Sequence, residues 1–266
     1  MMIDSHCHLD RIDLAPYQND LGQFMDHLSD EQISHLLCVS IDLDSLPAMW
    51  SLVKDFNNIC ISVGVHPNVK LTVDQEPSVD DLINIAQHKR VVAIGETGLD
   101  YFRSEGDLSW QHQRMRTHIQ AAKQLKLPII IHTREAKDDT LKLLREEGAD
   151  EVGGVIHCFT EDWEMACQAM DLGFYISFSG IVTFKNALSI QDVASRIEDE
   201  KFFIETDSPY LAPVPHRGKP NYPSYVKHVA EKIAELRDTS VEKVCESSTR
   251  NYHRLFTKVS EFAAQE

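Results

Sequence analysis

The sequence lacks long hydrophobic runs, internal repeats and low-complexity segments. None of its apolar stretches approaches the roughly 20 residues that a membrane-spanning helix needs, so we expect no membrane partner. Its first residues also lack the basic segment and apolar stretch of a secretory signal. Because proline and glycine are spread along the chain and form no linker, we expect one domain over residues 1–266.

Regularly spaced cysteine pairs are absent as well. The six cysteines form no CxxC pair and stand at Cys7, Cys38, Cys60, Cys158, Cys167 and Cys245. Scattered thiols in a chain of this size are typical of a reduced compartment and predict a cytoplasmic protein. The sequence also has no GxSxG motif and no Cys–His pattern for nucleophilic catalysis.

Positive charge is scarce, because 26 Lys and Arg residues face 42 Asp and Glu residues, for a net charge of −16. This balance argues against broad electrostatic adhesion to nucleic acid or to anionic lipid. It does not exclude an anionic substrate, because bound divalent cations or a local basic loop would supply positive charge at the site itself.

Short apolar runs followed by turn-type residues are what the sequence does contain, and they read as buried parallel strands. We expect eight, at about 2–8, 34–41, 59–65, 91–96, 128–132, 152–157, 174–179 and 201–207. Helical periodicity marks segments between and after them, most clearly at 107–126, 161–172, 223–237 and 241–262. Eight strands alternating with helices predict an α/β fold, the (β/α)8 TIM barrel, over an open doubly wound sheet.

Residues that bind metals in proteins stand at the ends of five of these runs. They are His6, His8, Glu96, His132, His157 and Asp207. The carboxyl ends of barrel strands converge on one face, where the active sites of such barrels lie. The spacing of the first two residues also places both imidazoles on one side of a strand, while Cys7 points to the other. The sequence therefore predicts a metal site at this face.

Six ligands exceed the needs of one tetrahedral ion and suit two divalent ions about 3.5–4 Å apart. Glu96 is the natural bridging ligand, because a carboxylate offers two oxygens. Asp207 is the natural general base, because its carboxylate accepts a proton from water activated by the ions. Mixed nitrogen and oxygen ligands are compatible with Zn, Mn, Mg, Co or Ni.

The same residues lie in stretches that resemble the TatD-type metal-dependent deoxyribonucleases, a branch of the amidohydrolase-like barrels. The matching stretches are IDSHCHLD (3–10), GVHPN (64–68), GETGLDY (95–101), IIIHTREA (129–136), GVIHCFT (154–160), SFSGIVTFKNA (177–187) and ETDSPYLAPVPHRGKPN (205–221). The resemblance implies one metal held by His6, His8, Glu96 and Asp207, and a second held by Glu96, His132 and His157. It also implies hydrolysis of phosphodiester bonds in DNA.

Further residues at the strand ends are expected to support this chemistry. We expect His66 to lie beside the ligands at the mouth, and Glu205 to orient a metal-bound imidazole. Arg134, Arg217 and Lys219 are candidates for gripping phosphate, since guanidinium and ammonium groups donate to phosphate oxygens.

Other functions remain open on the sequence alone. The same water activation would hydrolyse an amide, a lactone or an aminoacyl ester, and RNA or aminoacyl-tRNA would be an alternative partner to DNA. A non-enzymatic metal store fits poorly, because structural metal sites are closed rather than spread around an open mouth. No feature of the sequence indicates an obligate protein partner.

Overall fold

Eight parallel strands pair in the order of the sequence, from β1 to β8, in the computed structural model, which describes residues 1–102 and 104–259. The ring closes at its mouth, where Asp207 N donates to His6 O at 2.9 Å and His8 N donates to Ser208 O at 2.8 Å. The predicted (β/α)8 barrel is confirmed. No described helix is both long enough and apolar enough to span a membrane.

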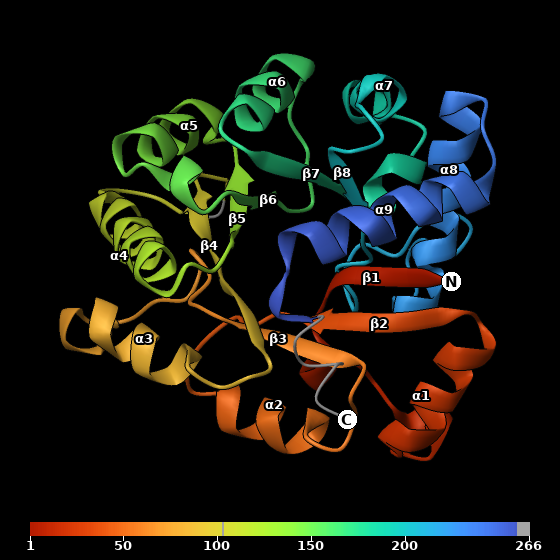
Figure 1. Cartoon of the computed structure of the whole chain (residues 1–266), viewed down its shortest axis with the longest axis horizontal. Helices are drawn as coiled ribbons and strands as arrows, with labels where there is room; N and C mark the ends of the chain where they lie inside the picture. The colour runs from red at the N-terminus through yellow and green to blue at the C-terminus, as the bar shows by residue number, and fades with distance from the viewer. Residues whose placement is uncertain (103, 260–266) are drawn as a thin grey trace.

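The helices alternate with the strands and surround them, and α9 crosses in front of the strands in Figure 1. The strands are β1 Met2–Cys7, β2 Ile33–Cys38, β3 Ile59–Val63, β4 Val91–Asp100, β5 Ile129–Arg134, β6 Gly154–Ile156, β7 Phe174–Phe178 and β8 Phe202–Ile204. The helices are α1 Leu21–Asp30, α2 Leu46–Val53, α3 Val79–Ala86, α4 Ser109–Leu125, α5 Lys137–Glu146, α6 Trp163–Asp171, α7 Leu188–Arg196, α8 Val226–Arg237 and α9 Val241–Leu255.

Two predicted boundaries were wrong in ways that matter. The fourth strand runs on to Asp100 instead of stopping at 96, because β5 continues to pair with it from Thr97 onward. The last helix ends at Leu255, because Phe256 leaves helical geometry, whereas the prediction extended it to 262. Residues 260–262 of that prediction lie outside the described residues.

Two apolar layers hold the barrel together. A small inner cluster fills the barrel and includes Ile3, Val92, Ile130 and Phe203, with Tyr252 of α9 packed against it. A larger outer cluster lies between the strands and the surrounding helices. Burial of apolar surface in both layers is the main driving force for this fold.

Irregular pairing reverses the side-chain alternation near the mouth. Ile3 and Cys7 are four residues apart and would point to the same face of a regular strand. Ile3 instead packs inside the barrel and Cys7 in the outer layer, because the β1–β2 register shifts between Asp4 and Cys7. Likewise Ile94 packs outside, whereas Glu96 lies among the imidazoles, and the β4–β5 register shifts between Ile94 and Thr97. Bulges of this kind re-aim side chains at barrel rims.

Helix α4 holds the loop that follows β3. Arg114 Nη1 donates to His66 O at 2.9 Å, and His118 Nε2 accepts from Val65 N at 3.0 Å. His118 Nδ1 donates to Arg114 O at 2.8 Å, so this buried imidazole uses both nitrogens in its neutral form. The loop bearing His66 is thereby fixed from the helix layer.

Replacing Gly98 should disrupt the approach of β4 to β5. A Cβ at Gly98, whose φ is +145°, would lie 1.9 Å from His132 O, whereas a Cβ at Gly106, φ +84°, would meet nothing within 4 Å. We expect Gly98→Ala to lower the free energy of unfolding by about 3 kcal/mol or more, and Gly106→Ala by about 1 kcal/mol, from its backbone conformation alone. Urea unfolding measures both, and equal losses would contradict the steric explanation.

Protonation of His118 should destabilise the fold in mild acid. Burial lowers the pKa of His118 from its ordinary value of 6.5 to about 4. As the pH falls, the unfolded chain therefore binds a proton at this imidazole before the folded chain does. The contribution of His118 to the free energy of unfolding is complete above pH 6.5 and is lost as the pH falls toward 4. We expect the free energy of unfolding of His118→Gln to depend less on pH across this window, by up to about 3 kcal/mol. If the free energy of unfolding depends on pH in the same way for the wild type and for His118→Gln, this role of His118 is contradicted.

Candidate metal centre

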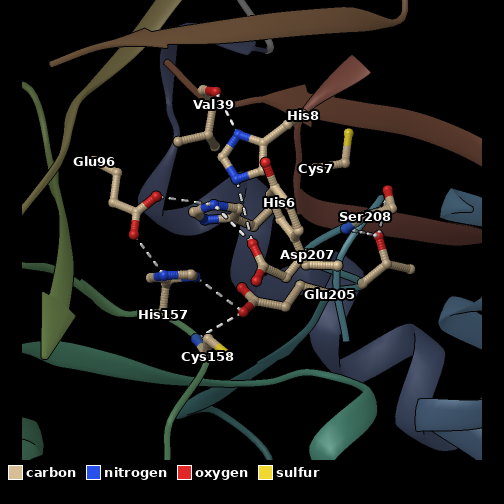
Figure 2. A network of polar contacts seen from close by, with 12 residues as sticks. His6, Cys7, His8, Val39, Glu96, His157, Cys158, Glu205, Asp207 and Ser208 are labelled. Atoms are coloured by element: carbon tan, nitrogen blue, oxygen red, sulfur yellow. Dashed lines mark hydrogen bonds and ion pairs between the residues drawn. The ribbon is translucent and has the colours of Figure 1, made fainter. Parts of the chain in front are cut away.

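Glu96 lies at the centre of the predicted ligands, and its two oxygens face different partners (Figure 2). Oε2 lies 3.4 Å from His6 Nε2. Oε1 lies 2.8 Å from His157 Nε2 and 3.1 Å from His132 Nδ1. A carboxylate that faces two groups of imidazoles in this way has the geometry of a ligand shared by two ions.

Asp207 faces the first group. Its Oδ1 lies 3.3 Å from His8 Nε2 and 3.7 Å from His6 Nε2. Ligand atoms about 2.0–2.1 Å from a tetrahedral ion lie about 3.3 Å from one another. The spacings among His6, His8, Glu96 and Asp207 are therefore close to those of atoms around one ion.

An unsatisfied buried atom supports the same interpretation. His6 Nε2 is buried and has no hydrogen-bond partner among the described residues, although it points at two carboxylates. Leaving a buried polar atom unpaired destabilises a fold by about 1–3 kcal/mol. A cation between His6 and the carboxylates would satisfy it, so the residues present fit a divalent metal.

Contacts behind the imidazoles select the nitrogen that faces the centre. His8 Nδ1 donates to Val39 O at 2.8 Å, and His157 Nδ1 donates to Glu205 Oε1 at 3.2 Å. In the neutral form of either ring, the proton on Nδ1 leaves the lone pair of Nε2 available to an ion between the ring and the carboxylates. The structure thus places Glu205 behind His157, where the sequence predicted an orienting carboxylate.

Glu205 is itself held by two further donors. Cys158 N donates to its Oε1 at 2.7 Å and Ser177 Oγ donates to its Oε2 at 2.6 Å. Figure 2 shows the carboxylate of Glu205 beside His157 and Cys158, with a dashed line to each. Each oxygen of this buried carboxylate therefore has a partner. Such fixed contacts determine the orientation of an imidazole ligand.

His66 reaches the centre in a different hydrogen-bonding state. Its Nδ1 accepts from Asn68 N at 3.0 Å, so the proton of the neutral ring lies on Nε2, which faces Glu96 Oε1 at 3.5 Å. Burial lowers the pKa of His66 to about 3, which keeps the ring neutral. In this tautomer His66 offers a proton to Glu96 and no lone pair to an ion.

The charges of the site are tightly coupled. Burial opposes ionisation of Glu96 and of His157, but their mutual attraction outweighs it: the pKa of Glu96 falls well below its ordinary value and that of His157 rises well above. Burial opposes ionisation of Asp207 too, but the contact with His8 and the nearby charges of His157 and His6 together lower its pKa. The carboxylates are therefore ionised near neutral pH, as metal ligands must be.

Asp100 is a member of the cluster that sequence reasoning missed. Its Oδ2 lies 3.2 Å from His132 Nε2 and accepts from Asn68 Nδ2 at 2.8 Å. Asp100 has the same parity as Glu96 along β4, so extending the predicted strand by four residues would have identified it.

The predicted phosphate-binding residues lie on the same face but apart from the ligands. Arg134 ends β5, and Arg217 and Lys219 lie in the loop after β8. Within residues 1–102 and 104–259, no hydrogen bond or ion pair joins any of the three to a predicted metal ligand. Their roles stay predictions.

Removing the charge behind His157 should weaken metal binding. Glu205→Gln keeps an oxygen for Cys158 N but places a neutral amide behind the imidazole. We expect metal affinity, measured by calorimetric titration of stripped protein with Zn or Mn, to fall about 10- to 100-fold. Glu161→Gln is the matched control, because Glu161 lines a separate hollow with Tyr101 and Lys137. Equal affinities of the two variants would contradict an orienting role.

Comparison with known proteins agrees with the geometry of the site. The model of the family described as TatD related DNase matches residues 3–257. The chain is 44% identical over 255 residues to the uncharacterized metal-dependent hydrolase YcfH of Escherichia coli K12, covering 96% of this chain and 95% of that protein. It is 39% identical to the uncharacterized metal-dependent hydrolase YabD of Bacillus subtilis, covering 96% and 99%.

A solved structure has the same fold. The crystal structure of YJJV, a TatD homolog from Escherichia coli K12, superposes with a TM-score of 0.87 at 23% identity, over 96% of this chain and 98% of that one. With the family match over nearly the whole sequence, the chain belongs to the TatD family of metal-dependent hydrolases.

Proposed function

We propose that this protein is a deoxyribonuclease that hydrolyses phosphodiester bonds of single-stranded DNA or of DNA ends with two divalent ions. The proposal rests on family membership, on the paired ligand groups that share Glu96, and on basic residues at the mouth. Its ions would be Zn, Mn, Mg, Co or Ni, all compatible with imidazole and carboxylate ligands.

Each residue has a separate task in this proposal. His6, His8 and Asp207 would hold one ion, His132 and His157 would hold the other, and Glu96 would be common to both. Bound ions of this type acidify a water molecule and polarise a phosphate oxygen. Asp207 would accept the proton of the attacking water, since its lowered pKa keeps the carboxylate ionised at neutral pH.

Unpaired arginines are the observation that favours phosphate over a carbonyl substrate. Of the described arginines, Arg11, Arg114, Arg116, Arg196 and Arg237 each form an ion pair with a carboxylate. No such pair is found for Arg134 or Arg217 among the described residues. Arg145 of α5 and Arg250 and Arg254 of α9 also lack one there, but only Arg134 and Arg217 follow the carboxyl ends of strands. Guanidinium groups without an internal counterion, beside a hydrolytic centre, suit an anionic substrate.

The test is cleavage of end-labelled single-stranded DNA by metal-stripped protein, with Mg, Mn, Zn and Co added back separately. We expect metal-dependent cleavage that Glu96→Ala abolishes, because this variant removes a ligand from both ions. Asp207→Asn should lower the rate about 100- to 10,000-fold, as expected for a lost general base.

The controls separate this proposal from the other reactions. Lys142→Ala should cleave like the wild type, since Lys142 is exposed on α5 and its one ion pair among the described residues is with Glu146 of the same helix. Absence of cleavage with every metal would overturn the proposal and favour a carbonyl substrate such as an aminoacyl ester. Faster hydrolysis of RNA than of DNA would identify RNA, and not DNA, as the preferred substrate.

A further inference from the structure

Most of the exposed large hydrophobic side chains among the described residues lie in segments that follow the carboxyl ends of the strands. Six large hydrophobic residues are exposed, and apart from Met1 all of them follow the carboxyl ends of strands: Val73, Phe102, Leu188, Tyr210 and Val214. Exposed apolar groups collected around a site mark a binding surface rather than a solvated one. The site therefore offers its substrate apolar contacts as well as metal ligands and charge.

Two of the mouth's aromatic rings carry an arginine on one face. The guanidinium carbon of Arg134 lies 3.8 Å from the centre of the Phe102 ring, and that of Arg217 lies 4.3 Å from the centre of the Phe184 ring. We call these the two stacked pairs. Neither arginine forms an ion pair with a carboxylate among the described residues, so the contact found for each guanidinium there is with an aromatic ring.

The stacked pairs lie on either side of strand β6. The first pair follows β4 and β5, and the second follows β7 and β8, while the end of β6 carries His157. A flexible chain that contacted both pairs would pass over the end of β6 and so over the metal ligands. Tyr210, 45% exposed, has its ring centre 5.8 Å from that of His8, which continues the aromatic surface toward the first ion's ligands.

We propose that the two stacked pairs bind unpaired nucleobases on both sides of the scissile phosphate, which makes single-stranded DNA the substrate form that this mouth accepts. This inference rests on the proposed nuclease function and deepens it. Phe102, 53% exposed, stacks on the face of a base, while the arginine beside it contacts the backbone phosphate. A base in a duplex has both faces covered by its neighbours and is not available for such stacking.

The test separates base contacts from phosphate contacts. Fluorescence anisotropy measures binding of a labelled 12-residue thymidine strand and of a matched abasic strand. The metal-loaded protein carries Asp207→Asn, so that the strands stay intact. We expect the thymidine strand to bind at least about tenfold more tightly than the abasic strand, because stacking contributes strongly for each base.

Substitution of the aromatic ring in the first pair should act mainly on the base. Phe102→Ala should weaken binding of the thymidine strand about tenfold and leave binding of the abasic strand unchanged, whereas Phe102→Trp should restore it. A merely structural role for Phe102 would weaken both strands equally, and that outcome would overturn the inference.

Substitution of the arginine in the second pair should act on phosphate. Arg217→Ala should weaken both strands and lower the slope of log affinity against log salt by about 1. Arg196→Ala is the matched control, because its guanidinium lies 4.3 Å from the Trp163 ring but between helices α6 and α7. An Arg196→Ala effect as large as that of Arg217→Ala would also overturn the inference.

The outcomes distinguish this inference from the nuclease proposal. If the wild type cleaves DNA but binds the abasic strand, or a duplex, as tightly as the thymidine strand, the stacking inference fails and the nuclease proposal stands. If the thymidine strand binds with the expected dependence on Phe102 but no metal supports cleavage, the nuclease proposal fails and the binding surface stands.

Discussion

The seam between the last strand and the first is the constraint on which the site depends. Asp4, fully buried, accepts from Thr206 N at 2.9 Å and from the Thr206 hydroxyl at 2.5 Å, and Ser5 Oγ donates to Ile204 O at 3.0 Å. Burial raises the pKa of Asp4 to about 8, so this carboxyl adds no further negative charge beneath the site at neutral pH. These contacts fix the chain just before His6 and Asp207, which face each other across the seam.

Above this seam, burial and charge act in opposition. Glu96, Glu205 and the imidazole of His157 are almost completely excluded from water, where isolated charges are strongly disfavoured. Their mutual contacts offset that penalty in the protein without ions. A positive imidazolium stabilises these carboxylates when no ion is bound, and a divalent cation would stabilise them when one is. The same arrangement of side chains therefore suits the site with and without metal.

The strand-end residues could be predicted because their order along the chain reflects a barrel whose strands all end on one face. The regular alternation of side chains along a strand does not predict which way these residues point. Counted from Ile3, which packs inside the barrel, regular alternation would direct His6 outward, and the irregular pairing of β1 directs it inward. Asp100 was missed because the strand was ended too early. The stacked pair of Phe184 and Arg217 joins loops after different strands, and a sequence does not state which loops meet.

The seam also has a consequence for when activity can arise during synthesis. Asp4 and Thr206, which join the two edges, stand 202 positions apart, and the ligands beside them are equally distant in the chain. A ribosome delivers the first edge long before the second, so a nascent polypeptide holds only part of the ligand set until its last strand docks. A hydrolase built on this seam stays catalytically silent while it is being made.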